Sequence, residues 1–338
     1  NRKFCVRIKD SFSTERNVTS GVPQGSILSP LLFIVYIADL PEFCKTEGVE
    51  IGLFADDLKA YHIDNPSPDF HLSLHNFIVK LADYCVINGL EIAIDKCFTL
   101  HIGNKNPNHT YSLSQTNIPN IPKGESVRDL GVYFTADLKW KSHINTIVTK
   151  ARRIAFTLLR SLRSNDYQFL VNTFKTYVMP ILEFACQVFN PYYAKDIKEI
   201  EKVQHEFINR VYFRCRKNQN LNGFTNTPPY AELLATFGLE SLELRRLKFC
   251  LKMFHQYLHG QIPIKTDAFT FLPTKTRGEK YKISIQPATN DVRFNSFFIR
   301  YARIYNQLDA NLKNTNPFEF SKQLNCTDLS KFLQTTYE

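Results

Sequence analysis

Hydrophobic and polar residues recur along this chain with two different periods, and the change comes near residue 139. Before it, apolar residues often alternate with polar ones, as in Phe4, Val6 and Ile8, which is typical of strands. After it, apolar residues recur every three or four positions, which is typical of helices with one buried face. The pattern predicts an α+β protein: an antiparallel sheet backed by helices, followed by a mostly helical part.

The first 139 residues contain signals for short elements separated by Gly, Pro and Asn. We expect two short strands within residues 4–20, an apolar helix over about 29–40, a hairpin over 49–63 and a helix over 71–88. A strand near 90–102, a turn-rich insertion at 103–122 and a last strand over Leu130–Phe134 complete this part.

The remaining residues are expected to form helices over about 142–164, 167–189, 195–216 and Leu242–His259. In the first of these, the apolar residues fall on one face, and Lys150, Arg153, Arg160 and Arg163 fall on the other. The tail after residue 260 is mixed. It contains a basic patch (Lys275, Arg277, Lys280 and Lys282) and an aromatic cluster (Phe297, Phe298 and Tyr301). We therefore expect three regions, residues 1–139, 140–260 and 261–338.

The charge of the chain changes at the same point as its hydrophobic pattern. Residues 1–139 contain 13 Lys and Arg against 16 Asp and Glu, whereas residues 140–338 contain 29 against 16. A mildly acidic part joined to a strongly basic one suits a metal-binding centre beside a surface that holds a polyanion. A basic surface that is merely solvated gives the same charge count. With 43% hydrophobic and 13% aromatic residues, the composition excludes an intrinsically disordered chain.

Eight widely spaced cysteines, with no Cys-x-x-Cys pair, argue against a zinc module and a disulfide scaffold. Reduced thiols indicate an intracellular protein of the nucleus or cytoplasm. No signal peptide or transmembrane segment is expected, because the apolar run Ile27–Leu40 is short and contains Pro30 and Asp39. The chain starts at Asn1 without a methionine, so we expect its natural N-terminus to lie further upstream.

Asp56 and Asp57 are the sharpest candidates for chemistry. Nucleotidyl transfer uses two Mg²⁺ ions about 4 Å apart, which are held by carboxylates. Adjacent residues of a strand point to opposite faces, but at a hairpin turn both side chains can reach one metal. Ala55 leaves room for a primer end, and Phe54 is expected to anchor the strand. An Asp-Asp pair in a turn is also ordinary turn chemistry, so the pair alone does not decide between the two interpretations.

A loop of Gly21-Val22-Pro23-Gln24-Gly25-Ser26 precedes the first expected helix. The glycines allow unusual backbone angles and close approach, and the side chain of Gln24 can both donate and accept hydrogen bonds. Such a loop suits contact with a nucleotide and a template base, although a plain connection between a loop and a helix has the same composition.

The order of these segments carries more information than any one of them. GVPQGSILSPLLFIVYIADLP, FADD, NGLEIAIDKC and RDLGVYF follow one another in this chain. Further on come KWKSHINTIVTKARR, TYVMPILEFACQVF, IEKVQHEFINR, LGLESLELRRLKF and FFIRYARIYNQL. Together they resemble the palm and the segments after it in reverse transcriptases of non-LTR (LINE-like) retrotransposons. The resemblance covers nearly the whole chain.

This resemblance implies a partial palm in residues 1–139, a helical thumb in 140–260 and a C-terminal extension in 261–338. It implies that Asp56 and Asp57 bind Mg²⁺ and that Gln24, Gly25, Phe54 and Ala55 lie against the nucleotide and template. Lys96 would be a general acid near the pyrophosphate, although a solvated lysine at a strand end is an equally good reading. Leu130, Gly131 and Val132 would grip the primer, and Lys150, Arg153, Arg160 and Arg163 would contact the nucleic-acid backbone.

The chain departs from the family pattern at its start. The family's first palm aspartate and its fingers lie before the glycine-rich loop, and only twenty residues precede that loop here. The resemblance therefore implies an RNA-directed DNA polymerase that acts on an RNA template, a DNA primer and dNTPs, but one that lacks a third metal ligand and is inactive in isolation. The alternative is a decayed or domesticated fragment that only binds nucleic acid. An intron-maturase relative is disfavoured by the RRLKF and FFIRYARIYNQL segments. Nothing in the sequence indicates the oligomeric state.

Overall fold

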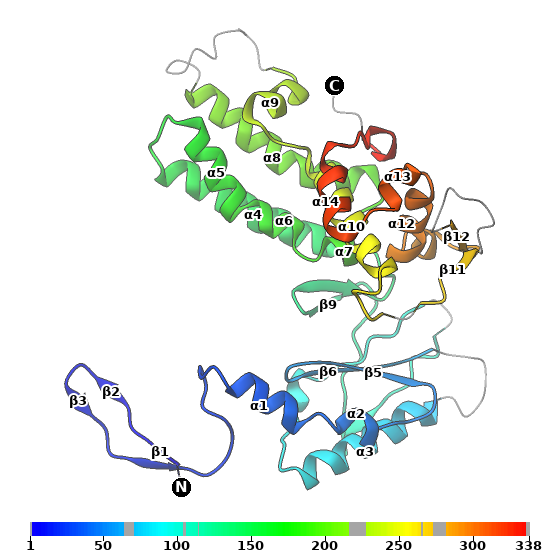
Figure 1. The fold of residues 1–338 in the computed structure, drawn as a ribbon. Coiled ribbons are helices and arrows are strands. Elements are labelled where there is room, and N and C mark those ends of the chain that lie inside the picture. Colours follow the sequence, from blue (N-terminus) through cyan, green and yellow to red (C-terminus); the bar gives the residue numbers. More distant parts are fainter. Residues whose placement is uncertain are drawn as a thin grey trace. The chain divides into compact units, whose positions relative to one another are not determined.

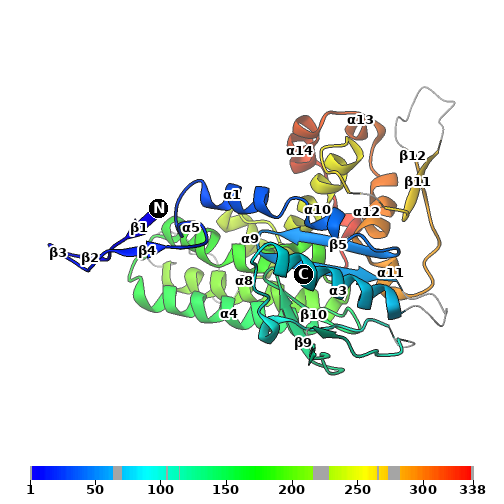
Figure 2. The same ribbon diagram turned by 90° about the horizontal axis from the view of Figure 1, so that it is seen from below.

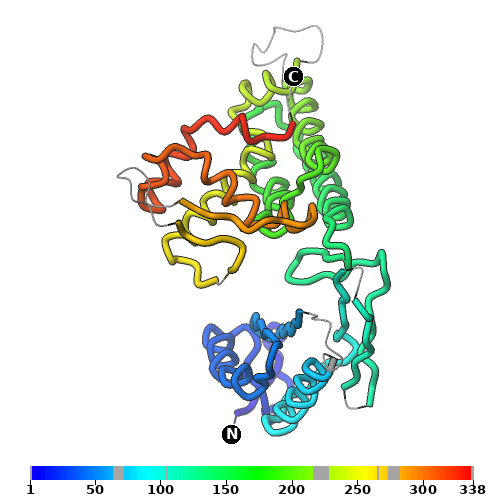
Figure 3. Tube along the Cα trace, turned by 90° about the vertical axis from the view of Figure 1, so that its right-hand side faces the viewer, coloured from blue at the N-terminus to red at the C-terminus, as the bar shows by residue number. Residues whose placement is uncertain are grey.

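The computed structural model describes residues 2–63, 71–103, 106–113, 115–215, 228–264, 266–272 and 282–335. The chain forms two compact units, residues 1–122 and 123–338, and passes from the first to the second once (Figure 3). The small sheets and many helices confirm the α+β class. The boundary between the units lies earlier than residue 139, and the assignment of palm, thumb and extension remains a prediction.

The first unit begins with a long, irregular hairpin. Strand β1 (Arg2–Phe4) pairs with β4 (Arg16–Val18), and β2 (Arg7–Ile8) pairs with β3 (Ser11–Phe12). The two strands expected here are therefore each interrupted. Residues 2–17 are all exposed, and the hairpin extends away from the helix that follows it (Figure 1).

The centre of the first unit is a hairpin packed on a helix. Strands β5 (Val49–Phe54) and β6 (Asp57–His62) pair in antiparallel register, and α3 (His71–Ile87) contacts both. Every second strand residue, from Ile51 to Ala60, faces the helix and packs around a small core of Leu40, Cys44, Phe77, Tyr84 and Cys85. The hairpin and the helix expected over 71–88 are thus confirmed.

One expectation for the first unit is confirmed in part and another is wrong. The helix expected over 29–40 begins at Ser29 but divides into α1 (Ser29–Tyr36) and α2 (Leu40–Phe43). The strand expected near 90–102 is instead irregular, with a 3₁₀ turn at Ile94–Lys96 and one bridge from Thr99 to Asn120. Leu90 and Ile92 do alternate with polar residues, but they pack on the small core without a partner strand. The alternation therefore arises here without strand pairing. Strands β7 (Ser112–Leu113) and β8 (Thr116–Asn117) form a short hairpin in the turn-rich stretch.

The second unit begins with a hairpin and continues in helices. Strand β9 (Ser126–Asp129) pairs with β10 (Val132–Thr135). The larger helices are α4 (Lys141–Ser161), α5 (Tyr167–Tyr177), α8 (Ala194–Cys215), α9 (Tyr230–Phe237), α10 (Leu242–Leu258), α12 (Phe297–Asn306) and α14 (Pro317–Cys326). The shorter elements are α6 (Met179–Glu183), α7 (Cys186–Phe189), β11 (Phe269–Leu272), β12 (Lys282–Ile285), α11 (Asp291–Phe294), α13 (Ala310–Lys313) and a 3₁₀ turn at Ser330–Phe332.

The helices expected near 142–164, 195–216 and 242–259 are confirmed as α4, α8 and α10, and α9 was not expected. The long helix expected over 167–189 is broken into three pieces. Pro180 is the second residue of α6, and Ala185 takes a left-handed conformation before α7. Helices α4 and α8 lie side by side (Figures 1 and 2). The guanidinium of Arg214 joins them by donating to the carbonyls of Leu159 and Leu162.

The end of the chain packs onto α10. Phe297 and Tyr301 of the expected aromatic cluster lie in α12, where Tyr301 is buried and Phe297 stacks near Phe254. Of the expected basic patch, Lys275, Arg277 and Lys280 lie outside the described residues. Among the described residues, no helix has the length and apolar character that crossing a membrane requires.

Two buried histidines make the second unit sensitive to acid. His255 accepts from the hydroxyl of Tyr305 through Nδ1 and donates to the carbonyl of Thr315 through Nε2, so its neutral form is fully hydrogen-bonded. His143 accepts from the backbone amide of Tyr133. Burial lowers the pKa of each imidazole to about 4.

Because both pKa values are lower in the folded state, protonation favours unfolding. We expect the free energy of unfolding to fall as the pH drops from about 6.5 to 4, by at most about 3 kcal/mol for each histidine. Urea unfolding of the second unit at several pH values measures this loss. His255→Gln should flatten the pH dependence, whereas His75→Gln, on an exposed site of α3, should not. An unchanged slope in His255→Gln would contradict the prediction.

Candidate functional site

The carboxylates of interest lie at the turn of the β5–β6 hairpin. Phe54 pairs with Asp57, so Ala55 and Asp56 form a two-residue turn. Ala55 has a φ of 51° and Asp56 does not have a positive φ, which is the pattern of a type II′ turn. The turn sets Asp56 and Asp57 next to each other at one end of the hairpin, as the sequence predicts.

Both carboxylates are available for a ligand. Asp56 and Asp57 are exposed, and neither side chain forms an ion pair or hydrogen bond with another described residue. Phe54 does not anchor the strand, which corrects the expectation. Its side chain is 63% exposed, because it alternates with Leu53, which faces the small core. The ring of Phe54 therefore lies on the solvent side, beside the carboxylates.

The glycine-rich loop forms a turn that is tied to the start of α1. The amide of Ser26 donates to the carbonyl of Pro23, and Gly25 has a φ of 80°, which glycine adopts without strain. The hydroxyl of Ser29, which is buried, also donates to the carbonyl of Pro23. Gln24 stays exposed. Among the described residues, no hydrogen bond joins this loop to the carboxylate turn.

Lys96 lies in the 3₁₀ turn, not at the end of a strand, and its side chain is exposed.

Asp39 has a structural partner: its carboxylate accepts from the hydroxyl of Tyr84, at 2.6 Å. Burial and this neighbouring carboxylate raise the pKa of Tyr84 above its ordinary value, so the phenol stays a hydrogen-bond donor.

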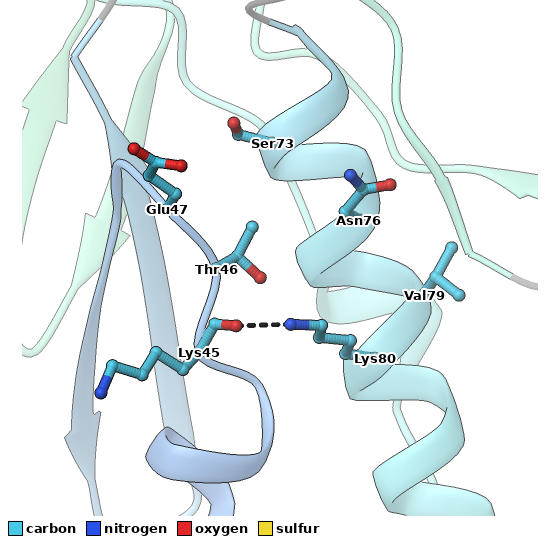
Figure 4. Close-up of a pocket in the computed structure, with 7 residues that line it drawn as sticks. All are labelled: Lys45, Thr46, Glu47, Ser73, Asn76, Val79 and Lys80. Carbon is cyan, nitrogen blue, oxygen red and sulfur yellow. Dashed lines mark hydrogen bonds between the residues drawn. The ribbon is translucent and has the colours of Figure 1, made fainter.

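A surface hollow of about 500 Å³ lies between the α2–β5 connection and α3 (Figure 4). Lys45, Thr46 and Glu47 line one side, and Ser73, Asn76, Val79 and Lys80 line the other. The ammonium of Lys80 donates to the carbonyl of Lys45 across it. This hydrogen bond ties the connection to α3, so we interpret the hollow as a structural junction between the two segments.

The hairpin expected to grip a primer is present in the second unit. Leu130 and Gly131 form its turn, with φ values of 43° and 88°, and Val132 begins β10 and is buried. Two hydrogen bonds hold the hairpin on α4. Tyr133 donates its amide to His143, and the hydroxyls of Ser126 and Ser142 lie 2.9 Å apart. Sequence reasoning did not single out His143, because a lone histidine on an apolar helix face gives no distinct signal.

The basic residues expected on α4 are exposed. Lys150, Arg153 and Arg160 follow one face of the helix, and Arg163 comes two residues after its end. None of the four pairs with a carboxylate among the described residues, whereas Arg152 pairs with Glu199 and Glu206 of α8. Among the described residues, the four cations are therefore unpaired and solvent-facing, and the buried face of the helix carries the apolar residues.

The sequence of the chain is similar to those of known polymerases. Residues 1–147 match the family described as reverse transcriptase (RNA-dependent DNA polymerase). The chain is 27% identical over 217 residues to the probable RNA-directed DNA polymerase from transposon X-element of Drosophila melanogaster. It is 23% identical over 235 residues to the RNA-directed DNA polymerase from mobile element jockey of Drosophila funebris. It is 29% identical over 143 residues to the Pol polyprotein of the type-2 retrotransposable element R2DM of Drosophila melanogaster.

The matched stretch, residues 1–147, includes the carboxylate turn and the glycine-rich loop. The relatives are polymerases of non-LTR retrotransposons, which confirms the resemblance. The matches cover 61%, 64% and 38% of this chain, but only 23%, 25% and 13% of the respective relatives. The chain thus corresponds to a quarter or less of each of these proteins.

The carboxylate turn makes a prediction about stability. A left-handed conformation costs an L-residue about 1–2 kcal/mol, and glycine avoids that cost. We therefore expect Ala55→Gly to raise the free energy of unfolding of the first unit by about 1 kcal/mol. The greater conformational entropy of glycine in the unfolded chain reduces this gain. Ala60→Gly, at an extended position of β6, is the matched control and should lower the same quantity by about 0.5–1 kcal/mol. Denaturant unfolding compares the two. Equal destabilisation by both variants would mean that Ala55 is not left-handed in solution.

Proposed function

We propose that this reverse transcriptase domain takes part in RNA-directed DNA synthesis, with an RNA template, a DNA primer and dNTPs as substrates. The observation that carries the proposal is the exposed Asp56-Asp57 pair at a hairpin turn, inside the segment that matches the family. The family itself implies a nucleic-acid template and primer. The roles of individual residues, the choice of Mg²⁺ and the dNTPs belong to this proposal.

The carboxylate turn fits a Mg²⁺ site. Mg²⁺ commonly binds proteins through one or two carboxylates and fills its other positions with water and substrate phosphates. Asp56 and Asp57 are adjacent, exposed and unpaired among the described residues, so binding a cation breaks no existing ion pair. A bound pair of ions would favour deprotonation of the primer 3′-hydroxyl and balance the charge of the leaving pyrophosphate. Among the described residues, no third Asp, Glu, His or Cys joins the two aspartates in a cluster.

The surrounding residues would position the substrates. Gln24 and Gly25, in an exposed turn, would lie against the incoming nucleotide and the template base. Ala55 has no side chain beyond Cβ, which leaves space for the primer end, and the exposed ring of Phe54 would contact a nucleotide. Lys96 would protonate the leaving pyrophosphate. These roles follow the family pattern and rest on the exposure of each side chain.

The second unit would hold the heteroduplex. Lys150, Arg153, Arg160 and Arg163, which pair with no carboxylate in the part of the chain that the structure describes, would contact phosphates. The Leu130–Val132 turn would grip the primer strand. An A-form-like duplex is recognised mainly by its backbone and its shape, and cationic side chains on a helix can contact its phosphates without reading bases. We place this activity inside the cell, in the nucleus or cytoplasm, where template and primer are found.

Nucleic-acid binding is tested by charge reversal on α4. Arg153→Glu together with Arg160→Glu should weaken binding to an RNA–DNA heteroduplex and lower the slope of log K against log salt by about two, one for each lost phosphate contact. Fluorescence anisotropy across a salt series measures both quantities. Lys322→Glu with Lys331→Glu, at exposed sites elsewhere in the unit, is the matched control. If the control and the α4 variant weaken binding equally, α4 is not the contact surface.

Catalysis by these 338 residues alone is a separate question. We expect the chain to bind a poly-rA/oligo-dT substrate without extending it, because Asp56 and Asp57 supply only part of a two-metal clamp. Loss of one charged group that stabilises a transition state costs on the order of 3 kcal/mol. Primer extension with Mg²⁺ or Mn²⁺ is the assay, and Asp56→Asn is the background control. Robust synthesis that disappears in Asp56→Asn would show that two aspartates suffice.

A further inference from the structure

An exposed aromatic ring lies directly against the turn that is proposed to grip the primer. A Cβ built on Gly131 would meet Cε1 of Phe184 at 3.0 Å, with Cζ at 3.7 Å and Cδ1 at 3.8 Å. The ring edge therefore occupies the space that any side chain at residue 131 would need. Gly131 also has a φ of 88°, so both its conformation and its neighbour favour glycine.

The backbone on both sides of Phe184 is firmly held. Glu183 accepts two hydrogen bonds from the guanidinium of Arg245 in α10, at 2.5 and 3.0 Å, and its side chain is only 11% exposed. Leu182 and Cys186 are fully buried. Ala185 takes the left-handed conformation that ends α6 and starts α7. The ring of Phe184 thus projects from a rigid base between two short helices.

The ring is nevertheless open to solvent. Phe184 is 59% exposed and Leu130, the other residue of the turn, is 41% exposed. A phenylalanine that served only to fill the space under the turn would be buried by it. The exposed face beside the turn is therefore left for a ligand, and the ligand must tolerate a flat apolar ring.

The charge of the second unit indicates which ligand this is. Residues 140–338 have 29 Lys and Arg against 16 Asp and Glu, and four of these cations follow α4 without a carboxylate partner among the described residues. The same hairpin is bonded to α4 through His143 and Ser142. Phosphate contacts on α4 hold a backbone but cannot fix where a strand ends. An aromatic ring can do so, because every base has a face that stacks on it.

We propose that Phe184 positions the Leu130–Gly131 turn and stacks against the 3′-terminal nucleotide of the primer strand. This inference rests on the proposed function, since it deepens the role of the primer-gripping turn. Phe184 acts in two ways. Its edge supports Gly131, and its open face meets the nucleotide.

The contact with the nucleotide is tested by comparing two ligands. One is an RNA–DNA heteroduplex with a recessed DNA 3′ end, and the other is the same duplex with that DNA end joined to the RNA by a loop, which leaves no 3′-terminal primer nucleotide. Phe184→Ala in the full chain should reduce the preference for the recessed end by about five- to hundredfold, the range of one aromatic–base stack, and leave the affinity for the looped duplex within about twofold. Phe184→Trp should restore the preference. Phe169→Ala, at an exposed phenylalanine of α5, is the matched control and should change neither.

The support of the turn is tested by a double-mutant cycle in thermal unfolding. Gly131→Ala should lower the melting temperature of the wild-type chain, because the new Cβ meets the ring and the alanine must adopt a positive φ. In Phe184→Ala the ring is absent, so the same substitution should cost less. Equal losses in both backgrounds would overturn the positioning role.

The two measurements separate the inference from the function beneath it. If the wild-type chain binds no heteroduplex, the proposed function fails, and the stability cycle still decides whether Phe184 supports the turn. If the chain binds both duplexes but prefers neither, or if Phe184→Ala keeps the preference, the stacking contact is wrong while nucleic-acid binding stands.

Discussion

A buried carboxylate that caps the start of α10 organises the second unit. Glu201 of α8 accepts from the backbone amides of Leu242 and Glu243, the first residues of α10, and from the hydroxyl of Tyr230, the first residue of α9. These amides have no partner within their own helix, and a negative charge is favourable at that end. Burial raises the pKa of Glu201, and the charge of Arg246 and these three donors partly offset that effect. One side chain therefore fixes the start of two helices against a third.

The position of the Leu130–Gly131 turn depends on that arrangement. Because α10 is fixed at its first turn, Arg245 is held where it can bind Glu183 through two hydrogen bonds. Glu183 in turn fixes the backbone that carries Phe184, and the ring of Phe184 meets Gly131. On its other side the hairpin is bonded to α4 by His143. The turn is thus held between two helices that the core orients, although it lies at the surface.

Sequence reasoning predicted the elements with strong periodicity and missed those that depend on tertiary contacts. The β5–β6 hairpin, α3, α4, α8 and α10 carry clear patterns, and the Asp56-Asp57 turn followed from the hairpin. The prediction of a strand near 90–102 was wrong, because Leu90 and Ile92 pack on the small core without pairing with another strand. Phe54 was expected to be an anchor, but register puts Leu53 inward and Phe54 outward. Nothing local indicates that Phe184 meets Gly131, since the contact joins residues 53 positions apart.

The two candidate contact surfaces are held with different firmness, and this bears on how each can work. The carboxylate turn stands on a core of five buried residues, and several apolar residues of the same unit, among them Ile27, Leu31 and Val35, are exposed. Exposed carboxylates interact weakly with a cation, because water screens the attraction. Substrate phosphates would displace that water and add ligands, so the metal binding proposed at Asp56 and Asp57 would strengthen when a nucleotide is bound. The turn at Gly131 needs no such help, because packing within its own unit already fixes its geometry.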